Sequence, residues 1–100
     1  MLRALVILSL ALSACSVGRP AADATGQEIY QQLCSNCHGD DLSGRLGPPL
    51  GPGSNSAELA DEFLDFAIRR GRGRMPSFSS TLNDEQITRL IGYIREVQTR

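Results

Sequence analysis

The stretch Cys34-Ser35-Asn36-Cys37-His38 constrains the fold of this chain more than any other feature. Its two cysteines stand three positions apart, and the only histidine in the chain follows the second cysteine directly. Side chains at positions i and i+3 of a helix lie on one face, so both thiols can reach the same large group while the imidazole points toward its centre. The fold must therefore leave room for one group beside these three side chains.

This spacing fits the C-x-x-C-H pattern for covalent attachment of a c-type haem, with thioether bonds from Cys34 and Cys37 and with His38 bound to the iron. A thioredoxin-like redox site needs a βαβ context, which the sequence lacks. A zinc site needs about four ligands, and the chain has no second Cys/His pair. A disulfide between the two cysteines would leave His38 unexplained. The sequence therefore predicts one covalently bound haem c as the cofactor.

The sixth coordination position of the iron has one candidate ligand. The single histidine excludes bis-histidine ligation, and Met75 is the only methionine besides the initiator. A lone methionine is ordinarily core filler. The surrounding stretch GRGRMPSF, residues 71–78, is a polar loop in which Met75 has little to pack against unless it turns inward. We therefore expect His38 and Met75 to be the two metal ligands.

The first 14 residues have the layout of a secretory signal peptide, with one early positive charge, an apolar run and small residues at its end. The run is too short to cross a bilayer as a helix, which needs ~20 apolar residues. Leu12-Ser13-Ala14-Cys15 resembles the bacterial lipobox, in which the cysteine receives lipid and becomes the new N-terminus. The alternative is an ordinary signal peptide cut nearby. We expect residues 1–14 to be a lipoprotein signal peptide and Cys15 to be the lipidation site.

Residues 15–24 are small and polar after Cys15 and lack hydrophobic periodicity, so they are expected to form a flexible linker. Nine extended residues would reach about 30 Å. The folded domain is then residues 25–100. A formal net charge of −1 excludes a global basic field for nucleic acid. So few aromatic residues make a thin core, and small domains often need a cofactor for stability.

Three amphipathic helices are expected, which makes the fold all-α, with loops wrapped around the haem. The first lies within residues 25–39, with Thr25 and Glu28 as a capping box. The second, residues 56–71, is expected to begin at Ser56 and to bury a face made of Leu59, Phe63, Phe66 and Ala67. The third lies within residues 83–98, with Asn83 as its N-cap and Gln86 three residues on. Its buried stripe is expected to be Ile87, Leu90, Ile91, Ile94 and Val97. Residues 39–56 carry too many glycines and prolines for a regular element.

Over nearly all of residues 25–100 the sequence resembles class I cytochrome c. Gly26 and Tyr30 match the family's glycine and aromatic where the first and last helices cross, and Leu90 and Tyr93 match their partners. The stretch around Met75 resembles the family's methionine loop. The resemblance also implies that the carbonyl of Pro48 accepts a hydrogen bond from the proximal histidine, here His38, and orients it.

Iron held by His and Met has no vacant position, so the resemblance implies a carrier of single electrons and not an enzyme. We expect a monomer with a redox protein as donor and another as acceptor. Export and lipid would place it on the periplasmic side, on the cytoplasmic or the outer membrane. Two alternatives remain open: an electron-transfer subunit of a larger oxidase or dehydrogenase complex, and a gas-binding haem protein with Met75 weakly held.

Four arginines gather between Arg69 and Arg74, just before the expected ligand. They could pair with a haem propionate, form a basic docking rim for an acidic partner, or be a solvated charge run. Asp61, Glu62 and Asp65 precede them and could neutralise them locally.

Overall fold

A computed structural model describes residues 18–100, so the signal peptide expected for residues 1–14 and the expected lipidation site Cys15 lie outside the described residues. The described part is built from helices and loops, and its one β-type pairing is a bridge between Arg72 and Met75. The elements are α1 (Gly26–Leu33), α2 (Ser35–His38), the 3₁₀ helix η1 (Asn55–Glu58), α3 (Asp61–Arg70) and α4 (Asp84–Gln98). The predicted all-α architecture is confirmed for the described residues. No helix among residues 18–100 is long and apolar enough to cross a membrane.

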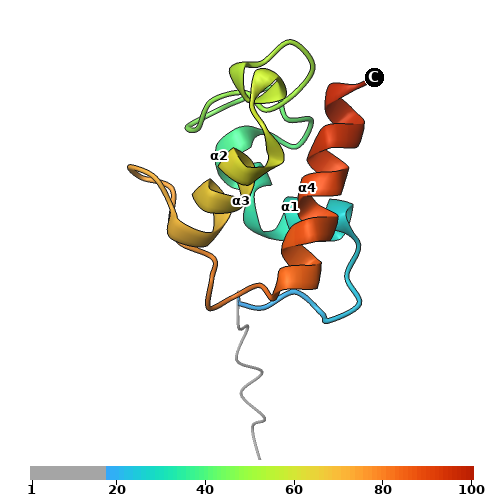
Figure 1. Cartoon of the computed structure of the whole chain (residues 1–100), viewed down its shortest axis with the longest axis vertical. Helices are drawn as coiled ribbons and strands as arrows, with labels where there is room; N and C mark the ends of the chain where they lie inside the picture. The colour runs from blue at the N-terminus through green and yellow to red at the C-terminus, as the bar shows by residue number, and fades with distance from the viewer. Residues whose placement is uncertain (1–17) are drawn as a thin grey trace, which may run out of the picture.

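The two end helices, α1 and α4, cross and pack against each other, and α3 lies on another side of α4 (Figure 1). Gly26 makes the crossing possible, because a side chain there would meet the backbone of Arg89 and lie 2.8 Å from the Cβ atom of Tyr93. The rings of Tyr30 and Tyr93 fill the angle between the helices, with centroids 5.6 Å apart. The crossing expected from the sequence is therefore present.

The stripe predicted on α4 is buried at all five positions, Ile87, Leu90, Ile91, Ile94 and Val97. The start of α4 is a complete capping box, in which the Asn83 side chain accepts from the Gln86 amide and the Gln86 side chain accepts from the Asn83 amide, both at 2.8 Å. At the start of α1 the Thr25 hydroxyl accepts from the Glu28 amide at 3.1 Å. Side-chain periodicity and capping residues therefore identify where both crossing helices, α1 and α4, begin.

The prediction for the second helix is wrong at its start and on its buried face. Helix α3 begins at Asp61, not Ser56, and its buried residues are Leu64 and Ile68. Of the expected face, Leu59, Phe63 and Phe66 are exposed, with Phe66 58% exposed. The later start of the helix is accounted for by Arg95, a side chain on α4.

The guanidinium of Arg95 binds the segment before α3 from the side. It donates to the carbonyl of Ser56 at 3.0 Å, to the carbonyl of Leu59 and to the carboxylate of Asp61 at 2.8 Å. Gln98, one turn farther along α4, donates to the carbonyl of Leu50 at 2.9 Å. These contacts hold residues 54–60 in the short 3₁₀ turn η1 and an extended connection, and α3 begins only at Asp61.

The linker expectation for residues 15–24 is wrong at its C-terminal end. The carbonyls of Ala22 and Ala24 accept hydrogen bonds from Arg89 at 2.7 and 3.0 Å, and the Gln86 side chain donates to the carbonyl of Ala21 at 3.2 Å. Ala24 is buried. The segment is held against α4, because the long polar side chains of Gln86 and Arg89 donate to its backbone carbonyls. The composition of the segment alone suggests that these carbonyls are hydrated.

We expect Gly26→Ala to destabilise the folded haem protein by about 3 kcal/mol, because the added methyl meets the backbone of Arg89 and forces the helices apart. Gly92→Ala on α4 is the matched control. A side chain at Gly92 meets nothing within 4 Å, so this change should stabilise the helix by about 0.5–1 kcal/mol. Urea unfolding followed by circular dichroism measures both values. Equal effects of the two substitutions would contradict the close crossing.

The buried phenol of Tyr30 predicts how the stability of the folded protein depends on pH. Its buried hydroxyl donates to the carbonyl of Gly39 at 2.7 Å, and burial raises its pKa well above the usual value. Above pH 10 the unfolded chain therefore loses this proton while the folded chain keeps it. Stability should be intact below pH 10 and then fall by up to about 1.4 kcal/mol per pH unit.

The chain contains no lysine, so few other groups titrate in this interval. Tyr30→Phe should cost about 1 kcal/mol at pH 7, by leaving the Gly39 carbonyl without its donor, and should reduce the alkaline loss. Tyr93→Phe, the control, should retain that loss. Unfolding curves at pH 8 to 12 measure it, and an unchanged pH dependence in Tyr30→Phe would show that this phenol is not responsible.

Candidate haem-binding site

The turn that carries the C-x-x-C-H motif begins where α1 ends. The amide of Cys34 still bonds to the carbonyl of Tyr30 at 2.8 Å, and the carbonyl of Cys34 then accepts from the amides of Cys37 at 3.2 Å and His38 at 3.0 Å. Cys34 is therefore both the C-cap of α1 and the N-cap of α2. The helix expected within residues 25–39 is divided at this residue. One tight turn presents both thiols and the imidazole.

Both cysteines of this turn are free thiols, but their surroundings differ. Cys34 is buried and Cys37 is exposed. Burial, together with the neighbouring Cys37, raises the pKa of Cys34 to about 12. A thiol with this pKa stays protonated at neutral pH, which does not suit a redox nucleophile. Thioether formation with a vinyl group does not require the residue to remain a thiolate.

His38 is buried, and its imidazole ring is held by a hydrogen bond to a backbone carbonyl. Its Nδ1 lies 2.8 Å from the carbonyl oxygen of Pro48, so the proton sits on Nδ1 and is donated to that oxygen. The lone pair of Nε2 is then free to bind a metal, and the hydrogen bond fixes the direction of the ring. The contact that the family resemblance implied for Pro48 is present.

The loop that supplies Pro48 is itself fastened to the motif. The amide of Gly47 donates to the carbonyl of Cys37 at 2.6 Å, and the amide of Gly44 donates to the carbonyl of His38 at 2.8 Å. A Cβ atom on Gly47 would lie 2.9 Å from Cε1 of the imidazole. Glycine is needed at 47 for this close approach, a role that the Gly-Pro-Pro sequence alone did not reveal.

Met75 comes from a different segment, the hairpin that follows α3. The amide and carbonyl of Met75 pair with those of Arg72 at 3.0 and 3.1 Å, and Gly71 adopts a left-handed conformation with φ of 74° at the start of the turn. Beyond it, the amide of Phe78 returns to the carbonyl of Ile68 on α3 at 2.9 Å. The Met75 side chain is half-buried and packs against the core.

The chemistry of this donor set fits haem c. Residues 18–100 contain no group of three or more His, Cys, Asp or Glu side chains able to hold a metal ion, so the zinc alternative has no support in the described part. What the turn does offer is two thiols beside one imidazole with a free Nε2, and a half-buried thioether on a second loop. The structure brings four predicted residues together, Cys34, Cys37, His38 and Pro48, and holds the fifth, Met75, on a separate hairpin closed by backbone hydrogen bonds.

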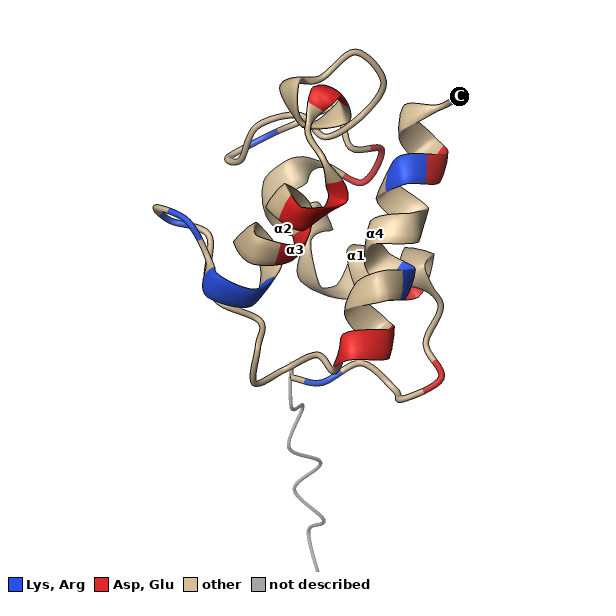
Figure 2. Ribbon diagram, viewed as in Figure 1, with Lys and Arg blue, Asp and Glu red and all other residues tan. Residues whose placement is uncertain are grey.

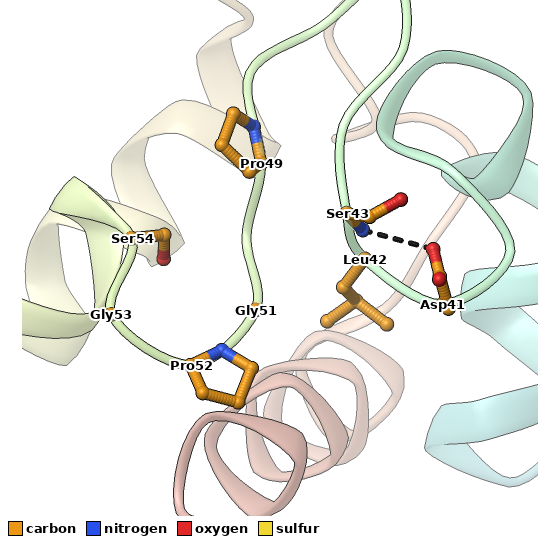
Figure 3. Close-up of a pocket in the computed structure, with 8 residues that line it drawn as sticks. All are labelled: Asp41, Leu42, Ser43, Pro49, Gly51, Pro52, Gly53 and Ser54. Atoms are coloured by element: carbon orange, nitrogen blue, oxygen red, sulfur yellow. Dashed lines mark hydrogen bonds between the residues drawn. The ribbon is translucent and has the colours of Figure 1, made fainter.

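A separate pocket of ≈ 320 Å³ lies in the glycine- and proline-rich loop (Figure 3). It is lined by Asp41, Leu42, Ser43, Pro49, Gly51, Pro52, Gly53 and Ser54. Its one carboxylate, Asp41, accepts from the Ser43 amide at 3.1 Å, and the hydrogen bonds from Ser43 lower its pKa. No residue of the C-x-x-C-H motif lines this pocket, so it is not the haem site.

Comparison with known proteins identifies the family. Residues 21–94 match the family described as cytochrome c oxidase, cbb3-type, subunit III. Cytochrome c-551 of Bacillus subtilis is 39% identical over 56 residues, which are 56% of this chain and 48% of that protein. The menaquinol:cytochrome c reductase cytochrome c subunit of the same organism is 34% identical over 80 residues, 78% of this chain and 30% of that protein.

Among solved structures, cytochrome cL from Hyphomicrobium denitrificans superposes with a TM-score of 0.67 at 33% identity. The match covers 73% of this chain and 45% of that one, so the chain spans less than half the length of these relatives. Proteins of this kind bind haem c and transfer electrons, which confirms the predicted cofactor and the resemblance to class I cytochrome c. The sequence, the fold and the family match over residues 21–94 agree, and the chain belongs to the c-type cytochromes of the family described as cytochrome c oxidase, cbb3-type, subunit III.

Proposed function

We propose that this domain is a monohaem carrier of single electrons, in which Cys34 and Cys37 bind haem c through thioethers and His38 and Met75 are the axial ligands. The observation that supports this most directly is the buried imidazole of His38, aligned by the Pro48 carbonyl beside two free thiols. Haem c, when bound, supplies one-electron cycling between Fe(III) and Fe(II).

The residues around the site have distinct roles in this proposal. The carbonyl of Pro48 orients the imidazole and raises its basicity through Nδ1. The thioether of Met75 is a soft ligand that favours the reduced iron and raises the reduction potential. Burial of His38 and the fastened loop from Gly44 to Pro48 limit movement of the ligand, so little rearrangement accompanies electron transfer.

A second candidate is an electron-transfer subunit of a larger complex. The family description names an oxidase subunit, and one relative is named as the cytochrome c subunit of a reductase. Co-purification of the domain with large membrane partners would favour this role over that of a free carrier. In either role the domain itself passes electrons and performs no further chemistry.

We also propose that the protein is exported and anchored on the periplasmic side by lipid on Cys15, at the cytoplasmic or the outer membrane. The apolar run ends in Leu12-Ser13-Ala14-Cys15, and export accords with membership of the c-type cytochromes. Lipid of more than one chain is needed for stable anchoring, since a single chain binds only marginally.

The axial assignment predicts that the oxidised protein, made in a host with haem-attachment machinery, shows the weak far-red absorption band of methionine bound to ferric haem. Met75→Leu keeps the apolar volume but removes the sulfur, so this band should disappear while the thioether-bound haem remains. Arg74→Gln, next to it, is the control and should keep the band.

Carbon monoxide provides an independent measurement for the same variants. The reduced wild-type protein should resist binding because both axial positions are filled, and Met75→Leu should bind the gas. Rapid binding by the wild type would instead support a gas-binding haem protein with Met75 weakly held. A band that persists in Met75→Leu would remove Met75 as the ligand.

The anchor is tested by labelling cells with radioactive palmitate. The wild-type protein should incorporate label and partition into the detergent phase, and Cys15→Ser should lose the label completely while any exported product still carries haem. Ser16→Ala, the neighbouring control, should keep the label. An unlabelled wild type would favour the ordinary signal peptide instead.

A further inference from the structure

The arginines of the described chain differ in whether a carboxylate pairs with them. Outside the Met75 region, Arg95 pairs with Asp61 and Arg100 pairs with Glu96, whereas Arg89 donates to backbone carbonyls and Arg19 and Arg45 form no ion pair with any described residue. Arg69 is also engaged, with carboxylate oxygens of Asp65 and Asp84 both 2.7 Å away. These two hydrogen-bonded carboxylates hold the pKa of Arg69 above its usual value.

The other three arginines of the cluster, Arg70, Arg72 and Arg74, are exposed and form no ion pair with any residue from 18 to 100. The local neutralisation considered from the sequence therefore reaches Arg69 only. Asp65 and Asp61 are used by other arginines, and Glu62 lies in the first turn of α3, two turns before Arg70. Figure 2 shows positively charged residues at the end of α3 and on the hairpin that follows it.

Two of these free arginines stack on exposed aromatic rings. The guanidinium of Arg70 lies 5.5 Å from the ring centroid of Phe66, and that of Arg72 lies 5.2 Å from the ring centroid of Phe63. Stacking restrains the guanidinium while leaving its N–H groups free to donate to carboxylates. We call the five residues Phe63, Phe66, Arg70, Arg72 and Arg74 the Arg–Phe patch.

The composition of the Arg–Phe patch is that of a binding surface. Aromatic residues and arginine are enriched where proteins contact one another, and they dominate the binding energy. The patch also adjoins the haem ligand of the proposed function, since the backbone of Arg72 is paired with that of Met75. A partner bound here would lie next to the methionine side of the site.

We propose that the Arg–Phe patch is the docking surface for the acidic face of a redox protein. The proposal rests on the electron-carrier function above. Unpaired guanidinium groups attract carboxylates and orient the encounter, while the exposed rings of Phe63 and Phe66 supply apolar contact once water is removed. Contact over less than about 1,200 Å² is typical of redox partners that must also separate quickly.

The test uses the haem-loaded protein and an oxidised flavodoxin, an acidic redox protein, as the probe. Binding is measured by titration calorimetry at several salt concentrations, without electron transfer. Wild-type binding should weaken with salt, because screening shortens the reach of the charges. The triple variant Arg70→Gln/Arg72→Gln/Arg74→Gln should bind about tenfold or more weakly at low salt and lose most of the salt dependence.

Arg72→Gln and Arg100→Gln form the matched pair, since each removes one positive charge from an exposed side chain. Arg72→Gln should weaken binding and Arg100→Gln should leave it nearly unchanged. Equal weakening by both would attribute the effect to net charge, and unchanged binding by the triple variant would overturn the proposal. The ligand assignment is read from the far-red band and the docking surface from flavodoxin binding, so a failed ligand assignment and a failed docking surface give different results.

Two further measurements separate other uses of these arginines. If the triple variant shifts the reduction potential of the haem but binds flavodoxin normally, the arginines serve the haem propionates. If it loses binding to phosphatidylglycerol vesicles but not to flavodoxin, the patch is a lipid-facing surface. Either result would overturn the docking proposal.

Discussion

The close approach of α1 and α4 at Gly26 is the constraint on which the rest of the domain depends. It lets the two helices share a core that includes Tyr30 and Leu90, close to the end of α1 at Leu33. The C-x-x-C-H turn begins at that end, and the Tyr30 hydroxyl reaches past it to the carbonyl of Gly39. The helix crossing and the haem-binding turn are therefore joined through Tyr30, whose ring packs on Tyr93 in the crossing and whose hydroxyl donates to Gly39 beyond the turn.

The site relies on backbone more than on side chains. Pro48 acts through its carbonyl and Gly47 through the absence of a side chain, while the hairpin of Met75 is closed by its own amide and carbonyl. Backbone groups fixed in this way hold a ligand in place without further polar side chains, which a domain with few apolar residues could not easily bury. A short sequence can thus hold in place the two side chains proposed as ligands, His38 and Met75, although they lie far apart in the chain.

The sequence predicted what local rules control and missed what depends on distant contacts. Capping at Asn83, the buried stripe of α4 and the motif around His38 follow from spacing of a few residues, and the structure agrees. The start of α3 could not be predicted, because it is decided by Arg95, which lies 36 residues beyond Leu59 and captures its carbonyl. The same holds for Ala24, held by Arg89 from 65 residues away, and for the imidazole contact that requires Gly47.

Arginine has two separate uses in this domain. The guanidinium fork of Arg89 binds two carbonyls of the N-terminal segment, and that of Arg95 binds two carbonyls before α3 together with a carboxylate. Lysine offers a single ammonium centre and would not span such sets of acceptors. Three further arginines that form no ion pair with any described residue, Arg70, Arg72 and Arg74, stand within five positions of one another. The molecule therefore has a local concentration of positive charge at the end of α3 and the hairpin after it, although its formal net charge is only −1.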